Sequence, residues 1–279
     1  MDEYMTEKMN KGLGAATYTF LYKESIFSAI ENLAESGFRI MELTATPPHV
    51  DIDNFDKQSR KQLRVLASSK GVEIFSVNPT YLDLNLASLN SGIRKETTRQ
   101  LRLSLQLCND LEAKLLVLFG GRRHVLIPAP LEIVKRVALE ELHGLLDYAS
   151  ELGVTIGLEN GPTLLFQTGS DLAEAIQLSS HPNLGAVFDV ANGHMVEDPA
   201  EGLTAVIQYV ALVHLSDTTR DKWAHKPAGD GDVQFDKIDK VLNAAGYIGP
   251  SILEVIDMDD PVNGLRRSAD NLKQYGWSP

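Results

Sequence analysis

The sequence contains a single cysteine, Cys108, among its 279 residues. One cysteine excludes an intramolecular disulfide and a structural zinc site built from several thiolates. No apolar run approaches the roughly 20 residues that a membrane-spanning helix needs. The segment from Met1 to Leu13 is polar and charged, unlike the apolar core of a signal peptide. We therefore expect a cytoplasmic protein with no membrane partner.

Basic residues are scarce relative to acidic ones. The chain has 26 Lys and Arg residues against 38 Asp and Glu residues, which leaves a formal net charge of −12. Because binding to nucleic acid depends on Lys and Arg at the phosphates, this balance argues against a DNA or RNA partner. Hydrophobic residues make up 43% of the chain, so a core can form without metal or disulfide cross-links.

Short apolar runs alternate with longer amphipathic segments from end to end. Each run that we predict as a strand is rich in Val, Ile, Leu, Phe or Tyr. The predicted strands are Ala15–Phe20, Arg39–Leu43, Glu73–Asn78, Leu115–Phe119, Thr155–Glu159, Ala186–Val190, Ala211–Leu215 and Ser251–Val255. Between them, the spacing of apolar residues predicts helices such as Ser25–Ser36, Lys95–Leu107 and Leu131–Leu152.

Eight strand–helix alternations predict an α/β fold with a parallel sheet, and eight strands close a (β/α)₈ TIM barrel. The alternative is a doubly wound open sheet, which usually carries a glycine-rich turn after its first strand. Here Gly12 and Gly14 precede the first predicted strand, and no such turn follows it. Since no linker or internal repeat interrupts the alternation, we expect residues 1–279 to form a single barrel domain.

Four polar residues stand where predicted strands give way to loops. They are Glu159, Asp189, His214 and Glu254. Each follows or interrupts an apolar run, where a buried charge is costly unless it is paired or bound to a metal. They belong to the last four predicted strands, whose ends share one face of a barrel. We therefore predict a site for one divalent ion, with Mn²⁺ as the first expectation and Mg²⁺, Co²⁺ or Zn²⁺ as alternatives.

This constellation resembles the sugar isomerase/epimerase superfamily, the xylose isomerase-like barrels that include D-tagatose 3-epimerase and L-ribulose-type 3-epimerases. The resemblance is carried by five motifs along most of the chain. They are L-E-N at Leu158–Asn160, F-D-x-x-x-G-H at Phe188–His194, H-L-S-D at His214–Asp217, H-x-x-x-G-x-G-x-x-x-F at His225–Phe235 and Y-x-G-x-x-x-L-E at Tyr247–Glu254.

The resemblance implies a role for each matching residue. Glu159 and Glu254 would bind the metal and also act as the acid/base pair. Asp189 and His214 would complete the coordination. Arg220, six residues after the metal histidine, would contact the substrate.

Several further residues are candidates for substrate contact. His225 opens a glycine-rich loop beside a metal strand, which favours contact with the substrate over a surface position. Glu42 either faces the same pocket or bonds a backbone amide or Arg39. Trp223 is either a platform for a sugar face or a loop anchor. The basic cluster Arg122–His124 either contacts a phosphate or carboxylate on the substrate or is solvated.

The sequence also departs from the pattern of the superfamily. In the branch of apurinic endonucleases, extra histidines and an aspartate build a three-zinc site, and these are replaced here by Phe119 or Gly120 and by Trp223. Together with the acidic balance, these losses argue against DNA cleavage. The histidine expected three residues after the metal aspartate is Asn192, and we expect His194, two positions further on, to reach the substrate instead.

These residues predict an enzyme that moves a proton next to a carbonyl. A divalent ion on the carbonyl and hydroxyl oxygens stabilises the enediolate. One glutamate removes the proton and a second returns it on the opposite face, which makes an epimerase, or to the neighbouring carbon, which makes an aldose–ketose isomerase. Expulsion of a β-hydroxyl would instead make a dehydratase of an inosose or dehydroshikimate type. An inactive barrel that serves as a binding subunit is the other alternative. The resemblance implies a sugar, sugar phosphate or polyol substrate and a homodimer or homotetramer.

Overall fold

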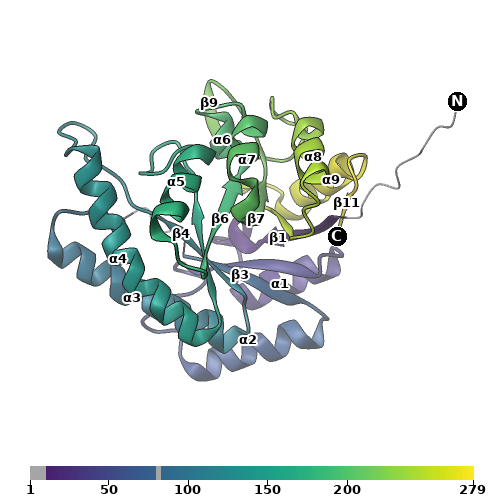
Figure 1. Cartoon of the computed structure of the whole chain (residues 1–279). Coiled ribbons are helices and arrows are strands. Elements are labelled where there is room, and N and C mark those ends of the chain that lie inside the picture. The colour runs from purple at the N-terminus through teal and green to yellow at the C-terminus, as the bar shows by residue number, and fades with distance from the viewer. Residues whose placement is uncertain (1–10, 80–82) are drawn as a thin grey trace, which may run out of the picture.

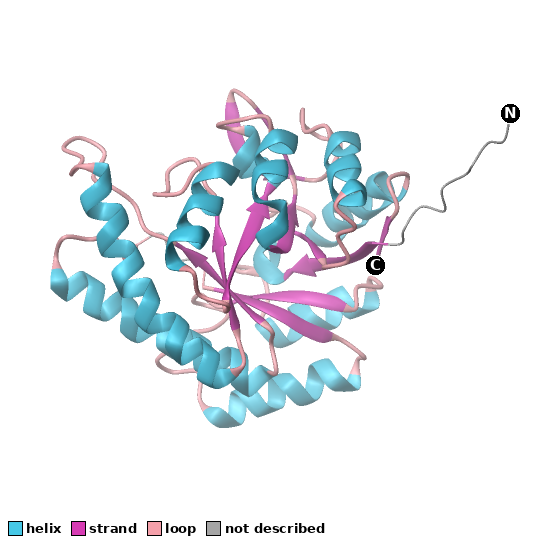
Figure 2. Ribbon diagram, viewed as in Figure 1, coloured by secondary structure: helices cyan, strands magenta, loops and turns pink. Residues whose placement is uncertain are grey.

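The computed structural model describes residues 11–79 and 83–279. Eight parallel strands form a closed barrel with helices between them, which confirms the predicted TIM barrel (Figures 1 and 2). The barrel strands are β1 (Lys11–Ala16), β2 (Ile40–Thr44), β3 (Glu73–Asn78), β4 (Leu115–Phe119), β5 (Thr155–Glu159), β6 (Leu184–Asp189), β7 (Val210–Leu215) and β10 (Ser251–Leu253). Each strand pairs with the next, and β10 pairs with β1 to close the barrel.

Helices connect the strands and cover the outside of the barrel. They are η1 (Thr17–Phe20), α1 (Ile26–Glu35), α2 (Lys57–Ser69), α3 (Ser91–Leu111), α4 (Leu131–Leu152), α5 (Gly169–Ser179), α6 (Val190–His194), α7 (Pro199–Val206), η2 (Ile207–Tyr209), α8 (Phe235–Ala244) and α9 (Pro261–Lys273). None of the helices in the described ranges has the length and hydropathy of a membrane-spanning segment.

Three short strands lie outside the barrel. An antiparallel hairpin of β8 (Asp217–Thr219) and β9 (Lys222–Lys226) follows β7 directly. Near the end of the chain, β11 (Trp277–Ser278) runs parallel to the start of β1. The hairpin was not predicted from the sequence, and it determines where the side chains that follow His214 lie.

The first strand lies earlier than the sequence predicts. The predicted strand Ala15–Phe20 is wrong in its last four residues, because Thr17–Phe20 forms the short helix η1. The Thr17 hydroxyl accepts a hydrogen bond from the Thr44 amide at 2.9 Å, which ties this turn to the end of β2. Gly14 lies within β1, where it packs closely against β2. A Cβ at this position would lie 2.4 Å from the carbonyl oxygen of Ile40, so only glycine fits there.

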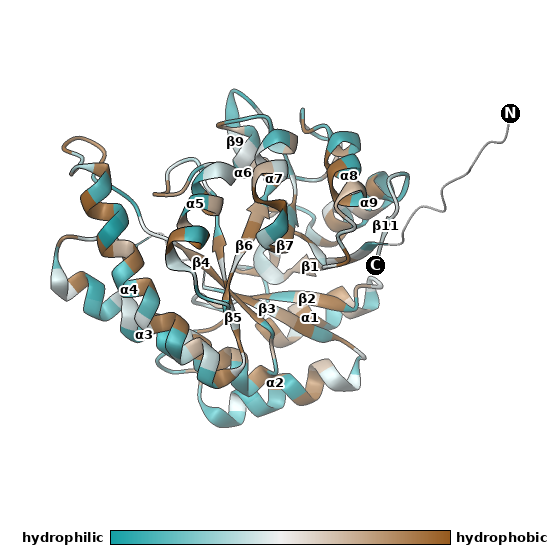
Figure 3. Ribbon diagram, viewed as in Figure 1, coloured by the Kyte–Doolittle hydropathy of each residue, from teal (hydrophilic) through white to brown (hydrophobic). Residues whose placement is uncertain are grey.

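Apolar side chains fill both the barrel and the layer outside it. The buried cluster inside the barrel consists of Ala16, Leu115, Val117, Val187, Leu212 and Ile252. Outside, amphipathic helices turn one face to the strands, as α1 does with Ile30 and Leu33 and α4 with Leu142 and Leu145 (Figure 3). Packing on both sides of the strands fixes where their carboxyl ends, and the polar side chains there, are placed.

Candidate metal centre and active site

Four side chains meet at the carboxyl ends of neighbouring strands. Glu159 ends β5, Asp189 ends β6, His214 lies near the end of β7 and Glu254 follows β10. Each is buried, and each offers one ligand atom within 4.8 Å of those of the other three. Parallel pairing places Asp189 opposite His214, which brings two of the four together through the backbone alone. The structure thus assembles the set that the sequence predicts.

The carboxylate oxygens of this cluster include two without partners. Glu159 Oε2 and Asp189 Oδ2 are buried and accept no hydrogen bond. A buried carboxylate oxygen without a partner is costly, and a cation is the group that offsets this cost most directly. Three carboxylates and one imidazole are also a ligand set that divalent ions accept. The residues therefore fit a divalent metal ion.

His214 presents one ring nitrogen to the carboxylates of the cluster. Its Nδ1 lies 3.1 Å from Glu159 Oε1, 3.8 Å from Glu254 Oε2 and 4.0 Å from Asp189 Oδ2. Because Nδ1 is the nitrogen that faces all three carboxylates, it is the atom that would bind an ion placed among them.

Glu42, the central residue of β2, lies on the other side of the His214 ring. Its Oε2 is 3.0 Å from His214 Nε2 and accepts a hydrogen bond from the Ser76 hydroxyl at 2.8 Å. Its Oε1 accepts one from the Asn78 amide at 3.0 Å. Arg39 donates instead to the carbonyl oxygens of Ala34 and Phe38. The structure therefore places Glu42 behind His214, where it is fully buried and contacts neither Arg39 nor the open cavity.

Burial and mutual repulsion perturb the titration of the cluster. Burial, together with the nearby carboxylates of Asp189 and Glu42, raises the pKa of Glu159 to about 7 against the opposing effect of His214. Burial likewise raises the pKa of Glu254 well above its ordinary value. For His214, burial would lower the pKa, but Glu42, Glu254 and Glu159 together raise it well above 6.5. Without a metal ion the cluster therefore retains protons near neutral pH.

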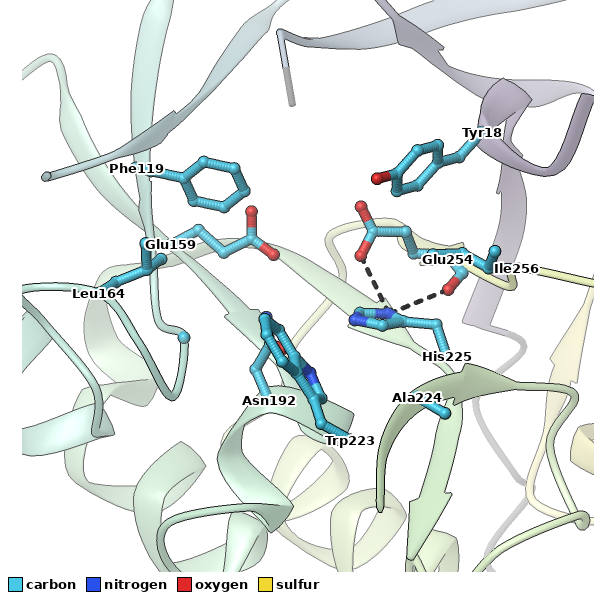
Figure 4. Close-up of a pocket in the computed structure, with 11 residues that line it drawn as sticks. Tyr18, Phe119, Glu159, Leu164, Asn192, Trp223, Ala224, His225, Glu254 and Ile256 are labelled. Carbon is cyan, nitrogen blue, oxygen red and sulfur yellow. Dashed lines mark hydrogen bonds and ion pairs between the residues drawn. The ribbon is translucent and has the colours of Figure 1, made fainter. Parts of the chain in front are cut away.

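A cavity of about 330 Å³ opens beside the cluster. Its lining consists of Tyr18, Phe119, Glu159, Gly161, Leu164, Asn192, Trp223, Ala224, His225, Glu254 and Ile256. The carboxylates of Glu159 and Glu254 point toward one another across it (Figure 4). A small molecule in this space would therefore have one carboxylate on each side.

The hairpin strand β9 brings Trp223 and His225 to this cavity. The Trp223 indole donates a hydrogen bond to Asn192 Oδ1 at 2.8 Å. His225 Nδ1 lies 3.1 Å from the Ser216 hydroxyl and 3.2 Å from the Glu254 carbonyl oxygen. Burial lowers the pKa of His225, Asp189 opposes this effect and His214 adds to it. Both residues predicted from the sequence to contact substrate thus line the same cavity as the two glutamates.

Two other predicted substrate residues lie elsewhere. Arg220 occupies the turn between β8 and β9, and its guanidinium donates to the Glu197 carbonyl oxygen at 3.0 Å. His194 ends α6, and both residues line a second, smaller cavity of about 180 Å³ that also contains Asp198 and Lys237. The structure does not bring Arg220 or His194 to the cavity of the two glutamates, and their contact with substrate stays a prediction.

Sequence reasoning assigned no role to two residues of the quoted motifs. The Asn160 side chain accepts a hydrogen bond from the Asp189 amide at 2.8 Å and donates one to the Asp189 carbonyl oxygen at 3.1 Å. Asn192 in turn donates to the Asn160 carbonyl oxygen at 3.0 Å. The buried carboxylate of Asp217 accepts backbone hydrogen bonds from Thr218, Gly229 and Val233. The position of Asn160 directly after Glu159 in the L-E-N motif was the signal from which its role could have been predicted.

Comparison with known proteins agrees with the barrel. The family described as "Xylose isomerase-like TIM barrel" matches residues 30–275. The curated relative "Uncharacterized protein MJ1311" of Methanocaldococcus jannaschii is 27% identical over 269 residues, which are 94% of this chain and 88% of the relative. The L-ribulose-5-phosphate 3-epimerase UlaE of Escherichia coli (strain K12) is 22% identical over 243 residues, 85% of each chain.

Solved structures show the same architecture. A D-tagatose 3-epimerase-like protein aligns with a TM-score of 0.83 at 26% identity, over 94% of this chain and 96% of that one. An L-ribulose 3-epimerase aligns with a TM-score of 0.80 at 16% identity, over 96% of this chain and 95% of that one. At 16% identity, the likeness to the L-ribulose 3-epimerase concerns the fold alone.

Proposed function

Because this chain belongs to the xylose isomerase-like TIM barrel family, we propose that it is a metal-dependent epimerase or isomerase of a sugar or sugar phosphate. In this proposal one divalent ion is bound by Glu159, Asp189, His214 and Glu254, and Mn²⁺ is the first expectation for its identity. The curated 3-epimerase of Escherichia coli and the 3-epimerase-like structure at 26% identity support the reaction class. A homodimer or homotetramer stays a prediction.

The observation that supports the proposal most is the placement of the two glutamates. The carboxylates of Glu159 and Glu254 approach the cavity from opposite sides (Figure 4). A substrate carbon between them would lose its proton to one carboxylate and receive a proton from the other, which inverts the centre. If the second carboxylate delivers the proton to the neighbouring carbon, the product is the aldose or ketose isomer.

The proposed ion and the remaining residues of the site support proton transfer by this pair. The bound ion supplies positive charge next to the substrate oxygens, where negative charge develops as the proton leaves. His214 and Asp189 hold their ligand atoms in place through β7 and β6. Trp223 and Phe119 line the cavity with aromatic surface beside the two glutamates. Glu159 and Glu254 each alternate between the protonated and the ionised form.

A dehydratase on the same scaffold is the second candidate. It needs a group that protonates a departing hydroxyl, and the His225 ring reaches the cavity beside Glu254 (Figure 4). The Nδ1 of His225 is 3.3 Å from Glu254 Oε2. A barrel without catalytic activity is disfavoured, because such a protein has no need for four buried ligand side chains that are costly without a metal.

The experiment that tests the proposal is proton exchange in D₂O. Metal-loaded protein is incubated with a panel of ketoses, their phosphates and keto-inositols, and deuterium incorporation next to the carbonyl is followed by NMR. We expect exchange with at least one ketose, accompanied by its epimer or isomer. Loss of water from a keto-inositol without any epimer would favour the dehydratase. Absence of exchange with the whole panel would contradict both candidates.

A further inference from the structure

Aromatic and aliphatic side chains form much of the wall of the cavity beside the proposed metal site. From these walls and from the charge around them, we infer that the substrate is an uncharged sugar or polyol rather than a phosphate ester. This inference rests on the proposed function and narrows its substrate class. The aromatic and aliphatic side chains that form the walls are Tyr18, Phe119, Leu164, Trp223 and Ile256 (Figure 4).

The charge around the cavity is negative. Among the described residues that line it, Glu159 and Glu254 are acidic, and none is Lys or Arg. Asp189 and Glu42 add two further carboxylates to the same cluster. In the proposed reaction one of the two glutamates is protonated at a time, so three carboxylate charges remain. A divalent ion offsets two of them, and His214 as a neutral ligand adds none. A phosphate dianion would therefore meet net negative charge at short range, where little water screens the repulsion.

Three basic residues of the neighbouring loops lie outside the lining of this cavity. Arg122 and Arg123 follow β4 and are exposed, and the Arg123 guanidinium approaches the Ala129 carbonyl oxygen at 3.4 Å. Arg220 donates to the Glu197 carbonyl oxygen and lines the second cavity. None of these three cations belongs to the lining of the cavity that contains the two glutamates. A phosphate on the substrate would thus lack the charge-assisted hydrogen bonds that usually hold it.

Trp223 supplies a surface that suits an uncharged sugar. Its indole is fixed by the hydrogen bond to Asn192, which is itself bonded to the Asn160 carbonyl oxygen. The C–H face of a sugar is apolar and packs against an aromatic ring, while the hydroxyl oxygens on its edge remain free to face the ion. A volume of about 330 Å³ lies at the lower end of small-molecule sites, which fits a single sugar unit.

Equilibrium binding tests the inference without any need for turnover. The Mn²⁺-loaded full chain is titrated by calorimetry with L-ribulose and L-ribulose 5-phosphate, and with D-fructose and D-fructose 6-phosphate. We expect the free ketose of at least one pair to bind, and its ester to bind on the order of tenfold or more weakly because of like-charge repulsion. An ester that binds as tightly as its free ketose, or more tightly, would overturn the inference. So would failure of both free ketoses to bind at the highest soluble concentration.

Variants of the cavity wall separate the contribution of the aromatic surface from that of charge. Trp223→Leu should weaken binding of the free ketose, whereas Trp223→Phe should retain most of it because an aromatic face remains. Ile256→Lys places a cation at the wall and should narrow the gap between ester and ketose. The double variant Arg122→Ala/Arg123→Ala should leave both affinities unchanged. If it abolishes binding of an ester, the loop cations serve the phosphate and the inference is wrong.

Binding and exchange fail independently of one another. A preference for the free ketose without deuterium exchange supports the inference on the ligand and contradicts the proposed reaction. Exchange that requires the phosphate ester supports the proposed reaction and contradicts the inference on the substrate.

Discussion

The His214 ring lies between two carboxylates, with Nδ1 3.1 Å from Glu159 Oε1 and Nε2 3.0 Å from Glu42 Oε2. Only Nδ1 faces the other members of the cluster. Glu42 thus engages the nitrogen that an ion on Nδ1 would leave free. With an ion on Nδ1, this contact would hold the orientation of the ring and place the ring proton on Nε2. Carboxylates that bond the outer nitrogen of a ligating histidine usually strengthen metal binding.

We predict that Glu42→Gln weakens Mn²⁺ binding by about tenfold to a hundredfold, the usual effect of losing such a carboxylate. The amide keeps the shape of the side chain but removes the negative charge that orients His214. Calorimetric titration of the metal-free protein with Mn²⁺ measures the change, independently of activity. Glu73→Gln, at an exposed position that begins β3, is the matched control and should bind Mn²⁺ like the wild type. Equal affinities of the two variants would show that Glu42 has only a structural role.

Replacing either glutamate of the acid/base pair should stop turnover. We expect Glu159→Gln and Glu254→Gln each to lower kcat by at least about two to four orders of magnitude, since an amide cannot exchange a proton. Circular dichroism should show an intact fold, because the amide fills the same buried space. Mn²⁺ titration of both variants separates loss of the metal from loss of the base. Retention of most activity by either variant would remove it from the proposed pair.

Metal binding should release protons and strengthen as the pH rises. Burial raises the pKa of Glu159 to about 7, and the surrounding acids raise the pKa of His214 well above 6.5. Below these values the metal-free cluster holds protons that an ion must displace, so affinity falls with decreasing pH. We expect about a tenfold loss per pH unit for each proton released. Titrations between about pH 6 and pH 8, in buffers with different ionisation enthalpies, count the protons. Affinity independent of pH would contradict the prediction.

The bounds of three strands and the grouping of the four candidate ligands could be predicted, because both depend on local pattern. The bounds of β3, β4 and β5 match the predicted strands, since each is an apolar run with polar or turn residues on both sides. Glu159 and Asp189 interrupt such runs at the barrel face, which makes them visible in the sequence. The direction of Arg220 could not be predicted, because it depends on the β8–β9 hairpin, whose pairing sets where that turn points. Likewise, the start of β1 was hidden by glycines that resemble a loop but allow close contact with β2.

Asp217 illustrates a residue whose role only the fold reveals. Its buried carboxylate accepts backbone hydrogen bonds from Thr218 at 2.9 Å, Gly229 at 2.8 Å and Val233 at 3.0 Å. It therefore ties the glycine-rich loop that follows β9 to the hairpin that carries Trp223 and His225.

We predict that Asp217→Ala lowers the free energy of unfolding by about 3 kcal/mol or more, since a buried amide left without an acceptor costs roughly 1–3 kcal/mol. Urea denaturation measures the loss, and Asp230→Ala, in the same loop with an exposed ion pair to Arg267, should cost less than about 1 kcal/mol. Because the loop would no longer hold β9 in place, Asp217→Ala should also weaken ketose binding while Mn²⁺ affinity stays near the wild-type value. This division is expected since the four proposed ligands lie at or next to the ends of barrel strands, whereas Trp223 and His225 belong to the hairpin. An equal loss of metal and ketose affinity would instead indicate that Asp217 supports the barrel as a whole.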